Sequence, residues 1–240
     1  TEGNTTYTQM LNPNGGIEAD LTVTCIEKNF FRVVSGAAVR SHDKKHILNN
    51  LKYDVEFSDI TENFACLGLF GPKSRDLLTD LAGDKFNTEQ FPFGSGKFLT
   101  VEGISIWFQR LSYVGELGWE VYIPIHNSKK IYDTIIEIGK TYQLIHAGAH
   151  AMDIMRMEKM YLHWGHDISP EENPYEAGLG FAVSLNKEQD FIGKNALKKI
   201  DQNQLTKKLC MFTLEKSEPG KPLLLHEEPI YLEGTIIGQT

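Results

Sequence analysis

The sequence predicts an α+β protein in which helices cover one side of antiparallel sheets. The first observation is the order of elements over residues 64–140, which reads as strand, helix, strand, hairpin and helix. The second is a segment at residues 17–26 in which apolar and polar side chains alternate, as they do on a half-buried strand. The third is a glycine-containing bend inside residues 110–124, which predicts two strands joined by a tight return.

The elements follow in order along the chain. After the turn at residues 12–16 and the strand at 17–26, a strand at 29–34 leads into a helix capped by Ser35. A short apolar strand at 64–70 precedes a helix that starts at Gly71-Pro72 and ends at Gly83. Strands at 104–111 and 119–123 are followed by a helix within 125–145. A last helix, from about residue 149, carries an apolar face of methionines and an isoleucine (Met152, Ile154, Met155, Met157 and Met160).

The chain divides in composition near residue 206. Residues 1–205 are expected to form the main region, with possible subdivisions near residues 60 and 145. Residues 206–240 are expected to open a small β-barrel, with a strand at 209–214, a loop at 219–222, and a strand and turn at 230–237. The chain starts without a methionine and ends inside an apparent hairpin, so we expect it to be a fragment of a longer protein.

Composition excludes several classes of function. The 240 residues carry a net charge of −8 without clustered lysine and arginine, which argues against binding to nucleic acid. No apolar run approaches the roughly 18 residues of a membrane span, and no secretory signal is present. Three widely spaced cysteines indicate a reducing compartment. We therefore expect a cytoplasmic location, or the mitochondrial matrix in a eukaryote.

Two carboxylates stand out because each lies inside a predicted strand. On the outgoing strand at 119–123, Glu120 and Tyr122 share one face and three apolar residues share the other (Trp119, Val121 and Ile123). On the strand at 17–26, Asp20 and Thr22 share a face. Either carboxylate can simply face solvent. Alternatively, a partly buried carboxylate can accept two hydrogen bonds from an arginine or from a guanidine-like ligand edge, such as that of a pterin.

Two motifs carry a resemblance that favours the ligand interpretation. Residues 112–120 read Ser-Tyr-x-Gly-Glu-x-Gly-x-Glu, and residues 12–21 read Asn-x-x-Gly-Gly-Ile-x-x-Asp-Leu. Both resemble segments of the aminomethyltransferase family, which includes the glycine-cleavage T-protein and the folate-binding C-terminal parts of dimethylglycine and sarcosine dehydrogenases. The resemblance covers nearly the whole chain and implies a T-protein-like folate-binding fold.

The resemblance also implies roles for individual residues. It places Asp20 at the reaction centre as the catalytic acidic residue, with Thr22 beside the ligand. It makes Glu120 the residue that binds the pterin, and it places the other lining positions at Tyr113, Tyr161 and the backbone of Val34. Tyr161 matches the dehydrogenase branch. The T-protein branch has a folate-binding arginine where this chain has Met152, which favours the dehydrogenase branch.

The implied activity is one-carbon transfer to tetrahydrofolate, which yields 5,10-methylenetetrahydrofolate. The implied partners are folate and a small methylated amine or its iminium. FAD would belong only to an upstream domain that is absent here, since no G-x-G-x-x-G follows a first strand. The alternatives are a stand-alone aminomethyltransferase of glycine cleavage and a non-catalytic regulatory or scaffold member of the family.

Metal and phosphate sites are weakly indicated. His42 and His46 are four residues apart on a predicted helix, and His163 and His166 precede Asp167 in a loop, but neither pair has further ligands nearby. Residues 94–97 read Gly-Ser-Gly-Lys without the spacing or the following helix of a phosphate-binding loop. We therefore predict no metal site.

Overall fold

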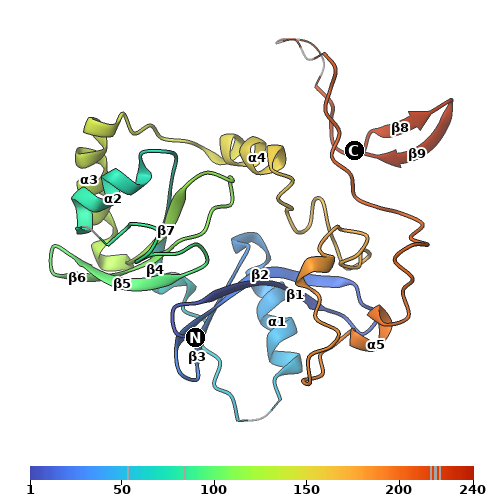
Figure 1. The fold of residues 1–240 in the computed structure, drawn as a ribbon, viewed down its shortest axis with the longest axis horizontal. Coiled ribbons are helices and arrows are strands. Elements are labelled where there is room, and N and C mark those ends of the chain that lie inside the picture. Colours follow the sequence, from blue (N-terminus) through green and yellow to red (C-terminus); the bar gives the residue numbers. More distant parts are fainter. Residues whose placement is uncertain (53, 84, 217, 219–220, 222) are drawn as a thin grey trace. The chain divides into compact units, whose positions relative to one another are not determined.

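The computed structural model describes residues 1–240 apart from residues 53, 84, 217, 219–220 and 222. The chain forms two compact units, Thr1–Leu209 and Cys210–Thr240. The first unit contains two antiparallel sheets with covering helices, which confirms the predicted fold class (Figure 1).

The first sheet is a three-stranded meander in the order β1-β2-β3, formed by Thr5–Leu11, Ile17–Glu27 and Phe30–Ser35. The turn between β1 and β2 is fixed by the Asn12 side chain, whose Oδ1 accepts hydrogen bonds from the backbone of Asn14 (2.9 Å) and Gly16 (3.0 Å). This turn sets a register in which Gln9 pairs with Asp20. Helix α1 (Arg40–Asn50) packs along this sheet (Figure 1).

The second sheet has four strands in the order β4-β7-β6-β5, formed by Phe64–Phe70, Gly118–Pro124, Ile104–Gln109 and Gly96–Val101. Helices α2 (Ser74–Ala82) and α3 (Ser128–Gly139) cover one face (Figure 1). Alternate residues of β7 point into the core beneath these helices, where Trp119, Val121 and Ile123 are fully buried. The predicted division of β7 into an apolar face and a Glu120 face is therefore confirmed.

The other face of the second sheet meets the first sheet. Ile26 of β2 packs with Trp107 and Tyr122, and Val34 adds to the same cluster. Hydrogen bonds reinforce the contact, because Gln109 Nε2 donates to Thr5 Oγ1 (2.5 Å). The faces that carry Asp20 and Glu120 are thus brought into one region of the first unit.

Residues 140–209 complete the first unit with little regular structure. They include helices α4 (Ala149–Glu158) and α5 (Lys194–Leu197), and their apolar residues form a core with the ends of β1 and β2. The prediction that the apolar residues of α4 pack into the core is wrong. Four of its five residues are exposed (Met152, Ile154, Met157 and Met160). The helix buries Arg156 instead, because that guanidinium pairs with Asp153 and Asp167.

Two boundary predictions are also wrong. Ser35 is the last residue of β3 and caps no helix; α1 begins at Arg40, after a 3-10 turn at Ala37–Val39. Residues 209–214 form no strand, because their backbone has no ladder partner in the described part of the chain.

The described part of the second unit contains a hairpin, β8 (Pro229–Leu232) with β9 (Thr235–Gln239), which confirms the predicted strand and turn. Most of the predicted loop at 219–222 lies outside the described residues, and the barrel stays a prediction. Among the helices that the structure describes, none is long and apolar enough to cross a membrane.

Candidate functional site

Asp20 lies on β2, and its carboxylate faces two side chains of the neighbouring strand. Gln9 Nε2 donates a hydrogen bond of 2.8 Å to Asp20 Oδ1, and the Tyr7 side chain lies close to the carboxylate. Burial raises the pKa of Asp20 above the usual range, although the interactions with Gln9 and Tyr7 oppose that shift. Burial and the nearby Asp20 charge likewise raise the pKa of Tyr7. The arrangement fixes a carboxylate in a poorly solvated place where it can hold or exchange a proton.

Tyr113 lies in the loop between β6 and β7 and joins the Asp20 region to the segment after α4. Its hydroxyl donates to the backbone oxygen of Leu162 (3.0 Å). Burial raises the Tyr113 pKa, the Arg156 charge lowers it, and Asp20 is close enough to contribute to the increase. Tyr113 and Asp20, 93 positions apart in sequence, therefore lie in one electrostatic environment.

Glu120 is the central residue of a second set of polar side chains, separate from the set around Asp20. It lies on β7, on the face opposite the helix-covered core, and the Tyr122 hydroxyl donates to its Oε2 at 2.5 Å. Burial raises the Glu120 pKa, and the Tyr122 bond opposes this. No described residue donates to Oε1, and this atom is not enclosed. Glu120 therefore offers a partly desolvated acceptor that is fixed on one side and available on the other.

Arg32 of β3 lies beside the Glu120–Tyr122 pair. Its guanidinium carbon is 5.3 Å from the ring centroids of Phe64 and Trp107 and 5.4 Å from that of Tyr122. Its Nε and Nη1 are buried and have no hydrogen-bond partner among the described residues. Cation–π attraction offsets part of that desolvation, and the stacked guanidinium restrains the Tyr122 ring that holds Glu120.

Thr22 and Val34 connect the surroundings of Asp20 with those of Glu120. They are directly paired across β2 and β3, and Thr22 also pairs with Tyr7 on its other side. Val34 packs against the cluster that contains Tyr122. Thr22 and Val34 therefore lie between Asp20 and Glu120, and their contact with a ligand stays a prediction.

Tyr161 is less closely tied to this region. It follows α4, where its backbone oxygen accepts from Arg156 Nη1 (3.1 Å), and its side chain is exposed. Its ring contacts neither Asp20 nor Glu120 in the contacts that the structure describes. Its role stays a prediction.

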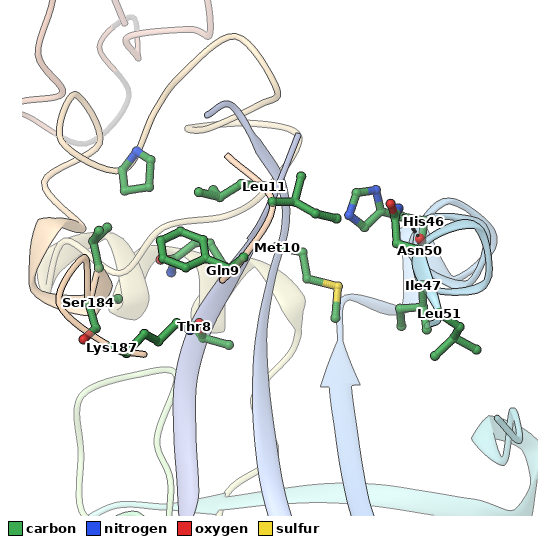
Figure 2. Close-up of a pocket in the computed structure, with 15 residues that line it drawn as sticks. Thr8, Gln9, Met10, Leu11, His46, Ile47, Asn50, Leu51, Ser184 and Lys187 are labelled. Atoms are coloured by element: carbon green, nitrogen blue, oxygen red, sulfur yellow. Dashed lines mark hydrogen bonds between the residues drawn. The ribbon is translucent and has the colours of Figure 1, made fainter. Parts of the chain in front are cut away.

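A cavity of about 320 Å³ is lined by Thr8, Gln9, Met10 and Leu11 of β1 (Figure 2). Residues of and just after α1, among them His46 and Asn50, line one side, and residues from the 174–192 segment line the other. Neither Asp20 nor Glu120 lines it. Gln9 is its link to the Asp20 site, because the Gln9 side chain bonds to Asp20.

The described residues contain no group of three or more His, Cys, Asp or Glu side chains that could hold a metal ion. His42 is instead placed between two carboxylates, with Nε2 3.2 Å from Glu18 and Nδ1 3.1 Å from Asp43. Lys97 at the end of the Gly-Ser-Gly-Lys run donates to the backbone oxygens of Lys85 and Gln90. Its ammonium group is therefore hydrogen-bonded within the protein.

Sequence reasoning missed Tyr7, Gln9, Arg32 and Tyr122 as supporting residues. A signal existed for two of them. Tyr122 is two positions from Glu120 and so shares its face, and a tight turn at residues 12–16 pairs Gln9 with Asp20. Arg32 and Tyr7 required the packed structure, since their roles depend on how the two sheets meet.

Comparisons with known proteins agree with this architecture. The GCVT N-terminal domain family matches residues 1–187. Human mitochondrial dimethylglycine dehydrogenase is 35% identical over 99% of this chain, and mouse mitochondrial sarcosine dehydrogenase is 34% identical over 98%. An aminomethyltransferase from Halothermothrix orenii is 33% identical over 99%. The chain spans 28%, 27% and 64% of these relatives, respectively.

A solved structure shows the same fold. The glycine cleavage system aminomethyltransferase T from Bartonella henselae superposes with a TM-score of 0.71 and 24% identity, covering 83% of this chain and 53% of that one. The match over residues 1–187 extends over more than half of the chain and includes both carboxylate-bearing strands. The chain therefore belongs to the GCVT N-terminal domain family, that of the aminomethyltransferases and of the related regions of dimethylglycine and sarcosine dehydrogenases.

Proposed function

We propose that this chain binds tetrahydrofolate and serves in one-carbon transfer, with 5,10-methylenetetrahydrofolate as product. The observation that carries the proposal is Glu120, a partly buried carboxylate with one oxygen held by Tyr122 and the other open. Such a carboxylate suits a ligand edge with two parallel N–H donors, which the 2-amino-4-oxo pyrimidine of a pterin presents. Thr22, Val34 and Tyr113 would line the same site, with Tyr161 at its margin.

Bound tetrahydrofolate would supply the nucleophilic nitrogen that takes up the carbon of an iminium or aminomethyl donor, with loss of the amine. Asp20 would act on that reaction in two ways. Its carboxylate would stabilise the positive charge of the donor, and its raised pKa would make it a better proton acceptor than an ordinary aspartate. Gln9 and Tyr7 would keep the carboxylate oriented between these steps.

The donor distinguishes two candidate settings. In a dimethylglycine or sarcosine dehydrogenase-like enzyme, a flavin domain elsewhere in the protein would oxidise a small methylated amine, and this region would receive the iminium. Exposed Met152 in place of a folate-binding arginine favours this setting over an aminomethyltransferase of glycine cleavage. The named dehydrogenase relatives are mitochondrial, and we propose the mitochondrial matrix in a eukaryote or the bacterial cytoplasm.

Asp20→Asn in the intact protein separates catalysis from binding. We expect folinic acid to bind nearly as well as to the wild type, because the amide keeps the shape and the Gln9 contact. Formation of methylenetetrahydrofolate should slow by about a hundredfold or more, the typical contribution of a positioned acid–base group. Asp133→Asn on the exposed side of α3 is the matched control.

An unchanged rate in Asp20→Asn would contradict the catalytic role of Asp20. Failure of the wild-type protein to bind folinic acid would contradict the proposal as a whole and would support the regulatory or scaffold alternative.

A further inference from the structure

Phe70 occupies an unusual position next to Glu120. It ends β4, where it pairs with Gly118 of β7, and Gly68 two residues earlier pairs with Glu120 itself. Paired residues and residues two apart share one face of a sheet. Gly68, Phe70, Gly118 and Glu120 therefore lie on the same face, opposite the helix-covered core.

The two glycines make room for the Phe70 ring. A Cβ atom on Gly68 would lie 2.5 Å from Phe70 Cε2, and a Cβ atom on Gly118 would lie 2.3 Å from Phe70 Cδ1. Both distances are far below van der Waals contact, so the ring lies across the places where these side chains would be. Alanine at Gly68 would have to displace the ring, whereas alanine at Gly118 would also meet the Leu69 backbone oxygen at 2.5 Å.

Core packing does not account for this arrangement. Phe70 is absent from the three buried apolar clusters that the described residues form, whereas Leu67 and Leu69 of the same strand pack into the core on the other face. The backbone around Phe70 is nevertheless fixed, because Gly71 N donates to the backbone oxygen of Leu117 (2.8 Å). Gly68 is exposed, so the surface beside Glu120 is open. The Phe70 ring is thus held beside the Glu120 carboxylate although it does not pack into a hydrophobic core.

We propose that Phe70, seated on Gly68 and Gly118, is the stacking floor of the Glu120 site and selects ligands that carry a planar heteroaromatic ring. The inference rests on the proposed function and deepens it. Glu120 fixes the edge of the ligand through hydrogen bonds in the plane of the ligand ring. Those bonds alone do not prevent the ring from rotating about that edge. Phe70 restricts the tilt by contact with the ring face. The ligand class is a fused heteroaromatic system with an amidine-like edge, of which the pyrimidine half of a reduced pterin is one.

Titration of the intact protein with 6-methyltetrahydropterin, folinic acid and p-aminobenzoylglutamate tests this assignment. Phe70→Leu should weaken binding of the two pterin-containing ligands by about three- to tenfold, the range of aromatic pair energies. Phe70→Tyr should bind within about twofold of the wild type, which also shows that the position tolerates substitution. Phe93→Leu, a change at an exposed phenylalanine in another loop, is the matched control.

A double-mutant cycle tests the role of Gly68. Gly68→Ala should weaken pterin binding to a similar extent by displacing the Phe70 ring, and it should cause less than about twofold further loss in the Phe70→Leu background. Additive losses, an unaffected Phe70→Leu variant, or an equal loss for p-aminobenzoylglutamate would each overturn the stacking role.

The outcomes separate the two proposals. If the wild type binds the pterins and Glu120→Gln weakens them while Phe70→Leu does not, only the stacking role is overturned. If the wild type binds neither pterin, the proposed function fails and this inference fails with it.

Discussion

Replacing Glu120 by glutamine tests the proposed ligand geometry with a change of one atom type. In the wild type, the Tyr122 hydroxyl donates to Oε2, and Oε1 stays available. If the glutamine oxygen keeps the Tyr122 bond, its NH₂ group replaces Oε1 and faces the N–H donors of the ligand. The variant thus loses a charge-assisted hydrogen bond in a partly desolvated place, which costs about 1.5–3 kcal/mol. Binding should weaken roughly ten- to hundredfold.

Isothermal titration calorimetry with (6S)-tetrahydrofolate or folinic acid measures this loss. Glu137→Gln is the control, because Glu137 is an exposed carboxylate on α3, which covers the opposite face of the same sheet. Equal affinities of wild type and Glu120→Gln, or an equal loss in both variants, would refute the reasoning.

The pH dependence supplies an independent check. Since burial raises the Glu120 pKa, wild-type affinity should fall on acidification at a higher pH than for an ordinary glutamate, and this fall should be absent in Glu120→Gln.

Three further substitutions test other parts of the structure. Asp20→Asn should stabilise the fold at neutral pH. Folding raises the pKa of the Asp20 carboxyl, so this group favours the folded state below its unfolded pKa, and that contribution is lost as the pH rises through the folded pKa. The gain in the free energy of unfolding of the variant, measured with urea, should therefore be smaller at pH 4 than at pH 7. Arg156→Met should lower the free energy of unfolding by about 1.5–3 kcal/mol, since it removes the charge-assisted hydrogen bonds that the buried guanidinium donates to Asp153 and to the partly exposed Asp167, and an unchanged urea midpoint would contradict this. Ile131→Ala should destabilise by about 2–5 kcal/mol through a cavity under α3, whereas Ile145→Ala, at an 81% exposed position, should change stability little.

Local pattern was enough to predict the strands that carry the two carboxylates. Alternation along β7 placed Glu120 opposite Trp119, and burial confirms that division. The glycine-rich turn before β2 was equally readable, because Asn12 and Gly16 form a recognisable local structure. These features depend on contacts between residues that are close together in the sequence, so the sequence alone was enough to predict them.

Long-range pairing was not readable from the sequence. β7 was expected to pair with the preceding strand, and it does, but it also pairs with β4, which lies some 50 residues earlier. That second pairing places Gly68 and Phe70 beside Glu120. The methionines of α4 show a second kind of error. Their helical spacing suggested that they are buried, but the side of the helix that is buried carries Arg156, which forms an ion pair with Asp167. The assignments of Asp20, Thr22, Val34, Tyr113, Glu120 and Tyr161 to a ligand site stay predictions.

The turn before β2 has a consequence for the order of folding. Gly16 is so close to the Pro170 carbonyl that a Cβ atom would lie 1.9 Å from its oxygen, and Trp164 donates to the backbone oxygen of Ile17, 147 positions away. Closing a loop of that length costs about 4 kcal/mol of chain entropy. The hairpin of β1 and β2 can form early from local contacts, but its anchorage must await residues 164–170. During synthesis, the strand that bears Asp20 would therefore leave the ribosome long before the segment that secures it.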